Sequence, residues 1–406
     1  MKEFVKKINI ILLLGIVIVF AVFSIAGRKT TINNELELTP FVAGGNIYYD
    51  IGEILANQKS NELDARFKNL NKKGVFNGTI LYAENGETIF KEAYGYEDFR
   101  HKDSLQLNAA FQLASVSKMF TAAAIMVLKE RGKLRFDDTL TKFIPEFPYY
   151  GITIRQLLAH RSGLSRYMSL ADKYWDINKP INNEQVISLF VKYKPDPYFK
   201  PNNGFHYCNT NYALLASVVE RISGQPFDVF VRDNIFNPLE MDDSFVYNLR
   251  GKEDINSKIS VGVPGYDYRR RRLVEVGDYY LNGVMGDKGV YASVEDLFKF
   301  NQALDNGTLV TNSTLEEAFT RGSAKYYKRK DNYGFGWRIR ESADSTAYHF
   351  GWWKGFRSFY IRDMKNNRTI IALTNTHHGF SSSILWDIIE DKNRTQDLLK
   401  IYNSLN

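Results

Sequence analysis

Strand-like segments at the two ends of the sequence enclose a long, mostly helical middle, and this order constrains the fold more than any other feature. Residues 78–83 and 88–94 are rich in strand formers and are joined through Asn85-Gly86, a pair that suits a type I′ hairpin turn because both positions need positive φ. Three further strand-like runs lie near the other end, at residues 333–339, 356–362 and 368–375. This order predicts one α+β domain whose sheet is built from both ends of the chain.

The middle of the chain shows helical periodicity between loops that contain Pro and Gly. Residues 115–131 contain neither Gly nor Pro, are rich in Ala, Met, Leu and Ile, and are followed by Gly132, which predicts a buried helix with a C-terminal stop. An earlier helix should begin at Ser60 and end before Gly74. Further helices are expected over residues 183–192, 211–223, 226–235, 294–304 and 382–390.

An uncharged, apolar segment, residues 8–27, follows a short lysine-bearing head. It exceeds the core of most cleaved signals and approaches the ~18 to 20 residues of a membrane-spanning helix. We predict an uncleaved anchor in the cell inner membrane, with the body on the periplasmic side. Ser24-Ile25-Ala26 would also pass as a cleavage site, which would release the body into the periplasm. The expected parts are an anchor or signal segment at 1–29, a spacer at 30–60 and one domain at 61–406.

The net charge of +7 does not indicate a nucleic-acid partner. Residues 1–29 carry five basic side chains and Glu3, which together give +4 and leave +3 for the remainder. The one dense basic cluster, residues 269–272, is interpreted as a solvated hairpin turn, with a phosphate or lipid site as the alternative. Cys208 is the single cysteine, so no intramolecular disulfide can form. No feature of the sequence indicates an obligate protein partner.

Ser115-Val116-Ser117-Lys118 places a hydroxyl and an amine one helical turn apart at the start of the predicted buried helix. Serine is a weak nucleophile until a base takes its proton, and a partly buried lysine can be that base when it is neutral. The N–H groups at the helix N-terminus can stabilise a developing oxyanion. Alone the tetrad is weak evidence, because a helix-capping Ser117 and a solvated lysine would have the same sequence.

Two further segments contain polar side chains suited to such a site. Tyr207 could relay the proton of a nucleophile, and Asn209 could hold a lysine or a substrate carbonyl by a hydrogen bond. His349 precedes Gly351, where a ligand could approach the backbone closely. Three interpretations of His349 compete: a buried histidine with satisfied hydrogen bonds, a metal ligand, or a polar group that faces a substrate carboxylate. The six histidines lack ligand spacing, so neither a metal nor another cofactor is predicted.

The order of these segments resembles the serine beta-lactamase-like superfamily, on the branch that holds class C beta-lactamases, penicillin-binding D,D-carboxypeptidases, D-aminopeptidases and related esterases. The resemblance spans residues 63–390, nearly the whole of the predicted body. It rests on S-x-x-K at 115, Y-x-N at 207, H-x-G at 349 and the stretches 153–164, 238–241 and 289–297. The resemblance implies an α+β fold with a five-stranded antiparallel sheet, flanking helices and a mostly helical insert.

The resemblance also implies a role for each residue of the site. Ser115 would attack a carbonyl and become acylated, while Lys118 and Tyr207 would exchange the proton. Asn209 would orient the lysine and the substrate, and the backbone N–H groups of Ser115 and Trp352 would form the oxyanion hole. The predicted catalytic residues are Ser115, Lys118 and Tyr207, and the predicted substrate-binding residues are Asn209, His349, Gly351 and Trp352.

His349 is the informative departure from the family pattern. It stands where many beta-lactamases and transpeptidases carry the lysine of K-T-G, whose cation attracts the substrate carboxylate, and a mostly neutral histidine does so less strongly. Trp352-Trp353 could wall the pocket with aromatic surface, although one of the two rings could equally belong to the core. Cys208 is expected to be a buried bystander, and His160 to order a turn by bonding to backbone.

The function expected from these features is that of an exported serine hydrolase. It would act through a Ser115 acyl-enzyme on a small peptide or ester, with D-amino-acid peptides and carboxylic esters as the substrate classes. Two alternatives stay open. One is beta-lactam hydrolysis, and the other is a non-catalytic protein that binds or senses peptidoglycan or beta-lactams.

Overall fold

The computed structural model describes residues 47–249, 262–270, 272–322, 332–340, 343–377 and 379–390. The chain divides into two compact units, one of residues 54–389 and one of residues 1–53 with 390–406. The predicted anchor at residues 8–27 and the first part of the predicted spacer lie outside the described residues. Within the described part, no helix has an apolar stretch long enough to cross a bilayer.

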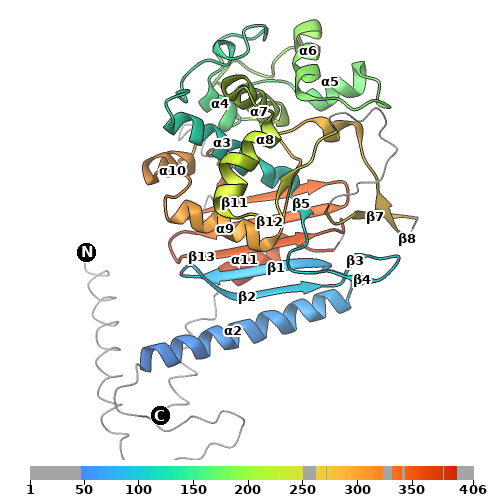
Figure 1. The fold of residues 1–406 in the computed structure, drawn as a ribbon, viewed down its shortest axis with the longest axis vertical. Helices are drawn as coiled ribbons and strands as arrows, with labels where there is room; N and C mark the ends of the chain where they lie inside the picture. Colours follow the sequence, from blue (N-terminus) through green and yellow to red (C-terminus); the bar gives the residue numbers. More distant parts are fainter. Residues whose placement is uncertain are drawn as a thin grey trace, which may run out of the picture. The chain divides into compact units, whose positions relative to one another are not determined.

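The larger unit is organised around one antiparallel sheet (Figure 1). In spatial order its strands are β10 (Arg338–Arg340), β11 (Ala343–Trp353), β12 (Phe356–Asp363), β13 (Arg368–Thr374), β1 (Gly78–Glu84) and β2 (Glu87–Tyr94). Strand β1 pairs with β13, so that Gly78 lies opposite Thr374, and the predicted sheet from both chain ends is confirmed. Asn85 and Gly86 have φ of 53° and 81°, as the predicted turn requires. Among the described residues the sheet has six strands, one more than expected.

Helices α2 (Ile47–Lys72) and α11 (Ser382–Glu390) cover one face of the sheet (Figure 1). Phe67 of α2 and Ile388 of α11 pack with Ile370 in one buried apolar cluster. Helix α2 begins at Ile47 rather than at the predicted Ser60, so the later part of the predicted spacer is helical. The stretch before Ser60 lacks an apolar period, but it contains no proline that would stop a helix.

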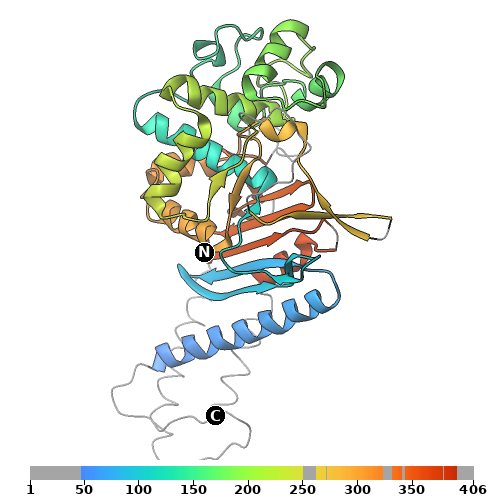
Figure 2. The ribbon, with the colours of Figure 1, turned by 45° about the vertical axis from the view of Figure 1, so that its right-hand side comes forward.

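The helical middle of the chain lies over the other face (Figures 1 and 2). Its helices are α3 (Ser117–Glu130), α4 (Ile154–Leu158), α5 (Tyr167–Tyr174), α6 (Asn183–Tyr193), α7 (Asn209–Ser223), α8 (Phe227–Val231), α9 (Val294–Asp305) and α10 (Asn312–Phe319). Helix α9 contacts β1 and β13, while α3 packs against α7. The predicted helix at 226–235 is split, because a π-helical turn, Arg232–Phe236, follows α8.

Short strands connect the helical layer to the sheet. Strand β9 (Val290–Ala292) pairs with β5 (Phe111–Gln112) and β6 (Phe245–Val246). This pairing brings residues 286–289 next to the segment that begins α3. Elsewhere, β3 (Tyr96–Asp98) pairs with β4 (Asp103–Ser104). The hairpin of β7 (Gly265–Arg269) and β8 (Arg272–Val276) carries the basic cluster at its tip, as predicted, and extends from the body (Figure 2).

Candidate active site

Ser115 lies in a single 3₁₀ turn, Ala114–Val116, directly before α3. Ala114 has a φ of 49°, a conformation that is strained for a residue with a side chain. Ser115 is partly exposed, whereas every other residue from 111 to 128 is buried. The turn therefore presents one hydroxyl at the edge of an otherwise buried segment.

Lys118 is fully buried, and its amine lies beside this hydroxyl. Nζ donates a hydrogen bond to Ser115 Oγ at 3.0 Å and a second to the backbone carbonyl of Asp287 at 2.7 Å. The first bond confirms that helical spacing brings the two side chains together. The second was not predicted, and it gives the amine a second fixed acceptor besides the serine.

Residues 286–290 are joined to α3 by further hydrogen bonds. The Thr121 hydroxyl donates to the carbonyl of Gly286 at 2.7 Å, and the Val290 N–H donates to Ser117 Oγ at 3.0 Å. Gly286 has a φ of 98°, and a Cβ there would lie 2.3 Å from the carbonyl oxygen of Tyr212, so only glycine fits. The alternative role of Ser117 as a helix cap is not observed, since its side chain binds Val290 instead.

The Tyr207 ring also lies near the Lys118 amine. The Lys118 amine is 5.1 Å from the centre of the Tyr207 ring, and no hydrogen bond joins the two side chains. Among the described residues, the buried Tyr207 hydroxyl has no hydrogen-bond partner. A buried hydroxyl without a partner is unfavourable, so this group is available to a bound substrate.

His160 holds the Tyr207 loop at two points. Its carbonyl accepts the N–H of His206 at 3.0 Å, and its Nδ1 accepts the N–H of Cys208 at 3.1 Å. The His160 ring also contacts the Tyr207 ring in a tilted arrangement, with centres 4.3 Å apart and planes at 42°. Burial, followed by the charge of Lys118, holds the pKa of His160 well below its ordinary value, so the imidazole is neutral. The prediction that His160 orders the backbone is confirmed, and Cys208 is buried, as expected.

Asn209 is the first residue of α7. Its Nδ2 lies 3.7 Å from the sulfur of Met168, and its buried Oδ1 has no partner among the described residues. No hydrogen bond joins Asn209 to Lys118, so the orienting role implied by the resemblance is taken in this structure by the Asp287 carbonyl.

His349 lies within strand β11 and is only 1% exposed. Its Nδ1 donates to the carbonyl of Phe350 at 2.9 Å, which leaves Nε2 to accept from the Tyr333 hydroxyl at 2.8 Å. Burial, reinforced by Lys118 and Arg338, holds the pKa of His349 well below its ordinary value. Both nitrogens are therefore occupied in a neutral ring. Of the competing interpretations, this geometry matches the buried, satisfied histidine rather than a group that faces a substrate carboxylate.

Gly351 lies against the turn that carries Ser115. A Cβ at this position would lie 2.1 Å from the carbonyl oxygen of Leu113 and 2.2 Å from Ser358 Oγ. The close approach that this glycine permits is therefore occupied by the Leu113 carbonyl rather than left for a ligand. It allows strand β11 to pack directly against the turn that carries Ser115.

The two tryptophans after Gly351 point to opposite faces of the sheet, because side chains alternate along a strand. Trp352 is 62% exposed and lies 4.7 Å from the His377 ring. Trp353 packs on the core beneath the helical layer, and its Nε1 donates to Asn282 at 2.9 Å. Trp353 is therefore the ring that belongs to the core, which was the alternative expected for one of the two, and Trp352 lies exposed on the opposite face.

Sequence reasoning missed Asp287, Tyr333 and Arg338. The guanidinium of Arg338 lies 5.1 Å from the ring centre of Tyr207 and 5.7 Å from that of Tyr333. In the described part of the chain, no carboxylate lies within ion-pair distance of Arg338. Strand β10 carries two arginines, Arg338 and Arg340, and no sequence signal reveals which of them lies beside Tyr207.

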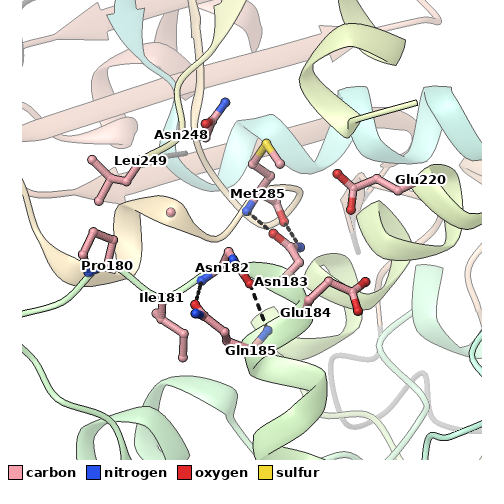
Figure 3. Close-up of a pocket in the computed structure, with 11 residues that line it drawn as sticks. Pro180, Ile181, Asn182, Asn183, Glu184, Gln185, Glu220, Asn248, Leu249 and Met285 are labelled. Carbon is pink, nitrogen blue, oxygen red and sulfur yellow. Dashed lines mark hydrogen bonds between the residues drawn. The ribbon is translucent and has the colours of Figure 1, made fainter. Parts of the chain in front are cut away.

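A separate pocket of about 400 Å³ lies beside the N-terminus of α6 (Figure 3). Its lining includes Asn183, Glu184 and Met285 and none of the seven predicted site residues. The Asn183 amide donates to the carbonyl of Met285 and accepts its N–H, both at 2.9 Å. The pocket therefore lies behind the segment that carries Asp287.

One cluster of metal-ligand type is present among the described residues, formed by Asp98, His101 and Asp103. It lies at the β3–β4 hairpin, and the Asp98–His101 contact at 2.9 Å accounts for the proximity of those two. None of the Ser115 site residues takes part in it.

Comparison with known proteins identifies the family to which the chain is similar. A model of the beta-lactamase family matches residues 63–393. Penicillin-binding protein 4* of Bacillus subtilis (strain 168) is 36% identical over 326 residues, which cover 78% of this chain and 72% of that protein. A penicillin-binding protein structure from Bacillus halodurans has a TM-score of 0.67 at 24% identity, with 80% of this chain and 97% of that chain covered. D-Amino acid amidase from Ochrobactrum anthropi SV3 has a TM-score of 0.63 at 22% identity, with coverages of 86% and 98%. The structural likenesses confirm the predicted fold class.

Proposed function

The chain belongs to the beta-lactamase and penicillin-binding-protein family of serine hydrolases, and from that premise we propose that it cleaves D-amino-acid peptides or related amides and esters through an acyl-enzyme on Ser115. The observation that carries this proposal is the 3.0 Å contact between Lys118 Nζ and Ser115 Oγ. A lysine in this position can take the serine proton at the moment of attack.

The reaction follows from the positions of these groups. Ser115 Oγ bonds to the substrate carbonyl carbon while its proton passes to Lys118. The backbone N–H groups of Ser115 and Trp352 are our candidates for the donors that stabilise the oxyanion. Lys118 then returns the proton to the leaving amine or alkoxide, with the unpartnered Tyr207 hydroxyl as the relay. Water next attacks the Ser115 ester, which releases the carboxylic acid and restores the serine.

The substrate class is supported by a charge near the site. Since the ring nitrogens of His349 are occupied, the group best placed to attract a substrate carboxylate is the Arg338 guanidinium above Tyr207. Arginine binds carboxylates by paired hydrogen bonds. A free carboxylate beside the scissile bond is the mark of a D,D-carboxypeptidase substrate. The names of the relatives, penicillin-binding protein and D-amino acid amidase, agree with acyl transfer on D-amino-acid compounds.

Chemical labelling tests the mechanism independently of the natural substrate. Purified protein is treated with a fluorophosphonate and its tryptic peptides are weighed. We expect an adduct on Ser115 and none in Ser115→Ala, which should keep its fold and lose turnover. Absence of the adduct in the wild type would instead support the non-catalytic binding protein. Rates on D-Ala-D-Ala peptides, D-amino-acid amides, nitrocefin and short acyl esters then separate peptidase, amidase, beta-lactamase and esterase activity.

We also propose that residues 8–27 anchor the hydrolase in the inner membrane, with its body on the periplasmic side. The support is the uncharged segment that follows a lysine-bearing head. Cell fractionation with an alkaline wash should leave the protein in the membrane pellet, and mass measurement of the N-terminus should find the segment intact. A mature chain that begins near residue 27 in the soluble periplasmic fraction would favour cleavage.

A further inference from the structure

Beside the Ser115–Lys118 pair lies a buried cluster of ionisable side chains to which the proposed mechanism gives no part. The Tyr167 hydroxyl donates to Asp287 Oδ2 at 3.0 Å. The Lys288 amine donates to the Tyr167 hydroxyl at 2.9 Å and to Asp287 Oδ1 at 3.3 Å. All three side chains are buried, so the carboxylate and the ammonium form an ion pair inside the core.

An ion pair in such a place is costly. Both ions lose their hydration, and replacement of a buried pair by apolar residues is often neutral or stabilising. Burial lowers the pKa of Lys288 from its ordinary value, Asp287 opposes that shift, and Lys118 adds to it. Burial also keeps the pKa of Tyr167 well above its ordinary value, so this phenol stays neutral and both donates and accepts. Stability alone is therefore a weak explanation for the pair.

The position of Asp287 suggests another explanation. Its side chain is bound by Lys288, while its backbone carbonyl accepts the Lys118 amine at 2.7 Å. The same segment is held one residue earlier by Thr121, through the Gly286 carbonyl. On its far side Asn183 binds Met285 (Figure 3). The carbonyl that orients Lys118 thus belongs to a segment fixed from several directions.

Lys118 has few charged neighbours. Asp287 supplies the one carboxylate of the described cluster, and Lys288 supplies a second cation. The ionisable groups that face Lys118 from the elements packed around it are Ser115, His160, Tyr207, Tyr212, Asp287, Lys288 and His349, with Arg338 beyond the Tyr207 ring. Both histidines are neutral. Asp287 and Lys288 are therefore the oppositely charged pair that accompanies Lys118 in this cluster.

We propose that Lys288 is a positioning residue for Lys118. Lys288 fixes the segment whose carbonyl, that of Asp287, holds the Lys118 amine. By pairing with the Asp287 carboxylate, Lys288 also prevents that carboxylate from stabilising the ammonium form of the catalytic lysine. The inference rests on the proposed function, because it matters only if Lys118 must be neutral to act as a base.

The test is the pH dependence of Ser115 labelling by a fluorophosphonate, measured on the full-length protein. The rate falls at low pH as the base becomes protonated. In Lys288→Met the Asp287 carboxylate loses its cation and favours protonated Lys118. We expect the acidic limb of the pH profile of the labelling rate to move up by about one pH unit. The double variant Asp287→Asn with Lys288→Met removes the carboxylate as well, and its limb should return to the wild-type position.

Two further variants provide a substitute for Lys288→Met and a control. Lys288→Gln keeps a donor for the Tyr167 hydroxyl and predicts the same upward shift, so it serves if Lys288→Met does not fold. Lys299→Met breaks a lysine–aspartate pair on helix α9, where Lys299 lies 3.1 Å from the buried Asp296, and should leave the limb in place.

The outcomes separate the two proposals. No labelling of wild-type Ser115 at any pH would refute the proposed function itself. Normal labelling with an unmoved limb in both Lys288 variants would refute the positioning role and leave the hydrolase intact. An equal shift in the single and double variants would also refute it, since the effect would then be independent of the Asp287 charge.

Discussion

The imidazole of His160 accepts the backbone N–H of Cys208 at 3.1 Å, so a buried neutral histidine holds the residue next to Tyr207. Its own carbonyl holds the residue on the other side of Tyr207. The His160 ring also contacts the tyrosine ring directly, with centres 4.3 Å apart. Thus one histidine fixes the position of the proposed proton relay without touching the nucleophile.

Loss of the contact between His160 and Cys208 should lower kcat more than it changes KM. In His160→Asn the side chain is too short to reach Cys208, although asparagine tolerates the φ of 56° at this position. We expect kcat to fall by about 10- to 100-fold with a smaller change in KM, because a misplaced relay affects proton transfer. Steady-state kinetics checks this. Cys208→Ser keeps the backbone N–H and is the matched control, and a wild-type kcat in His160→Asn would contradict the role.

Arg338 should determine the preference for substrates with a free carboxylate. In Arg338→Gln we expect KM for a carboxylate-bearing peptide to rise by about tenfold, the scale of one charge-assisted hydrogen bond. KM for the same peptide with an amidated terminus should change little. The control is Arg340→Gln, since Arg340 lies 4.3 Å from the Trp386 ring on α11 instead. Equal effects on both peptides would argue against carboxylate binding.

Gly351 should tolerate no side chain. The Cβ of Gly351→Ala would press on the Leu113 carbonyl, so either β11 or the Ser115 turn must move. We expect a loss of about 1–3 kcal/mol in the free energy of unfolding, measured in urea, together with slower labelling of Ser115. Gly277→Ala places its Cβ in open space and should leave both quantities unchanged. A fully stable, fully active Gly351→Ala would mean that the contact is not tight.

The buried histidines predict a pH dependence of stability. The pKa values of His160 and His349 are lowered well below the ordinary value by burial, so near pH 6 the unfolded chain binds protons that the folded chain excludes. Stability is then fully present above the unfolded pKa of about 6.5 and is lost as the pH falls below it. Each histidine contributes a slope of up to about 1.4 kcal/mol per pH unit.

Urea denaturation between pH 7.5 and 5.5 measures this slope. His349→Gln should remove one histidine's share of it. A slope that His349→Gln leaves unchanged would show that this ring is protonated in the folded state.

Local features of the site could be predicted from sequence, and long-range ones could not. Ser115 and Lys118 meet because helical geometry fixes residues three apart. The Asp287 carbonyl, by contrast, reaches Lys118 across 169 residues and belongs to the backbone, which any residue type could supply. No pattern of side chains marks such a contact.

In the fold, too, local features were predictable from the sequence and long-range ones were not. The Asn85-Gly86 hairpin was predictable because its turn chemistry is local. Strand β11 was missed, since its run of Ala, Ser, Thr, His and Gly lacks the alternation of an exposed strand. Without its register, the sequence could not decide which of Trp352 and Trp353 belongs to the core.

The pairing of β1 with β13 has a consequence for a growing chain. Ser115 and Lys118 leave the ribosome early, but Asp287, Gly351 and the partner strand of β1 are made much later. Contacts this far apart in sequence form late, because the chain between them must first be closed into a loop. Until residues 287 and 351 have been made, the growing chain therefore carries Ser115 and Lys118 without the carbonyl that holds the lysine and without the strand that packs against the Ser115 turn.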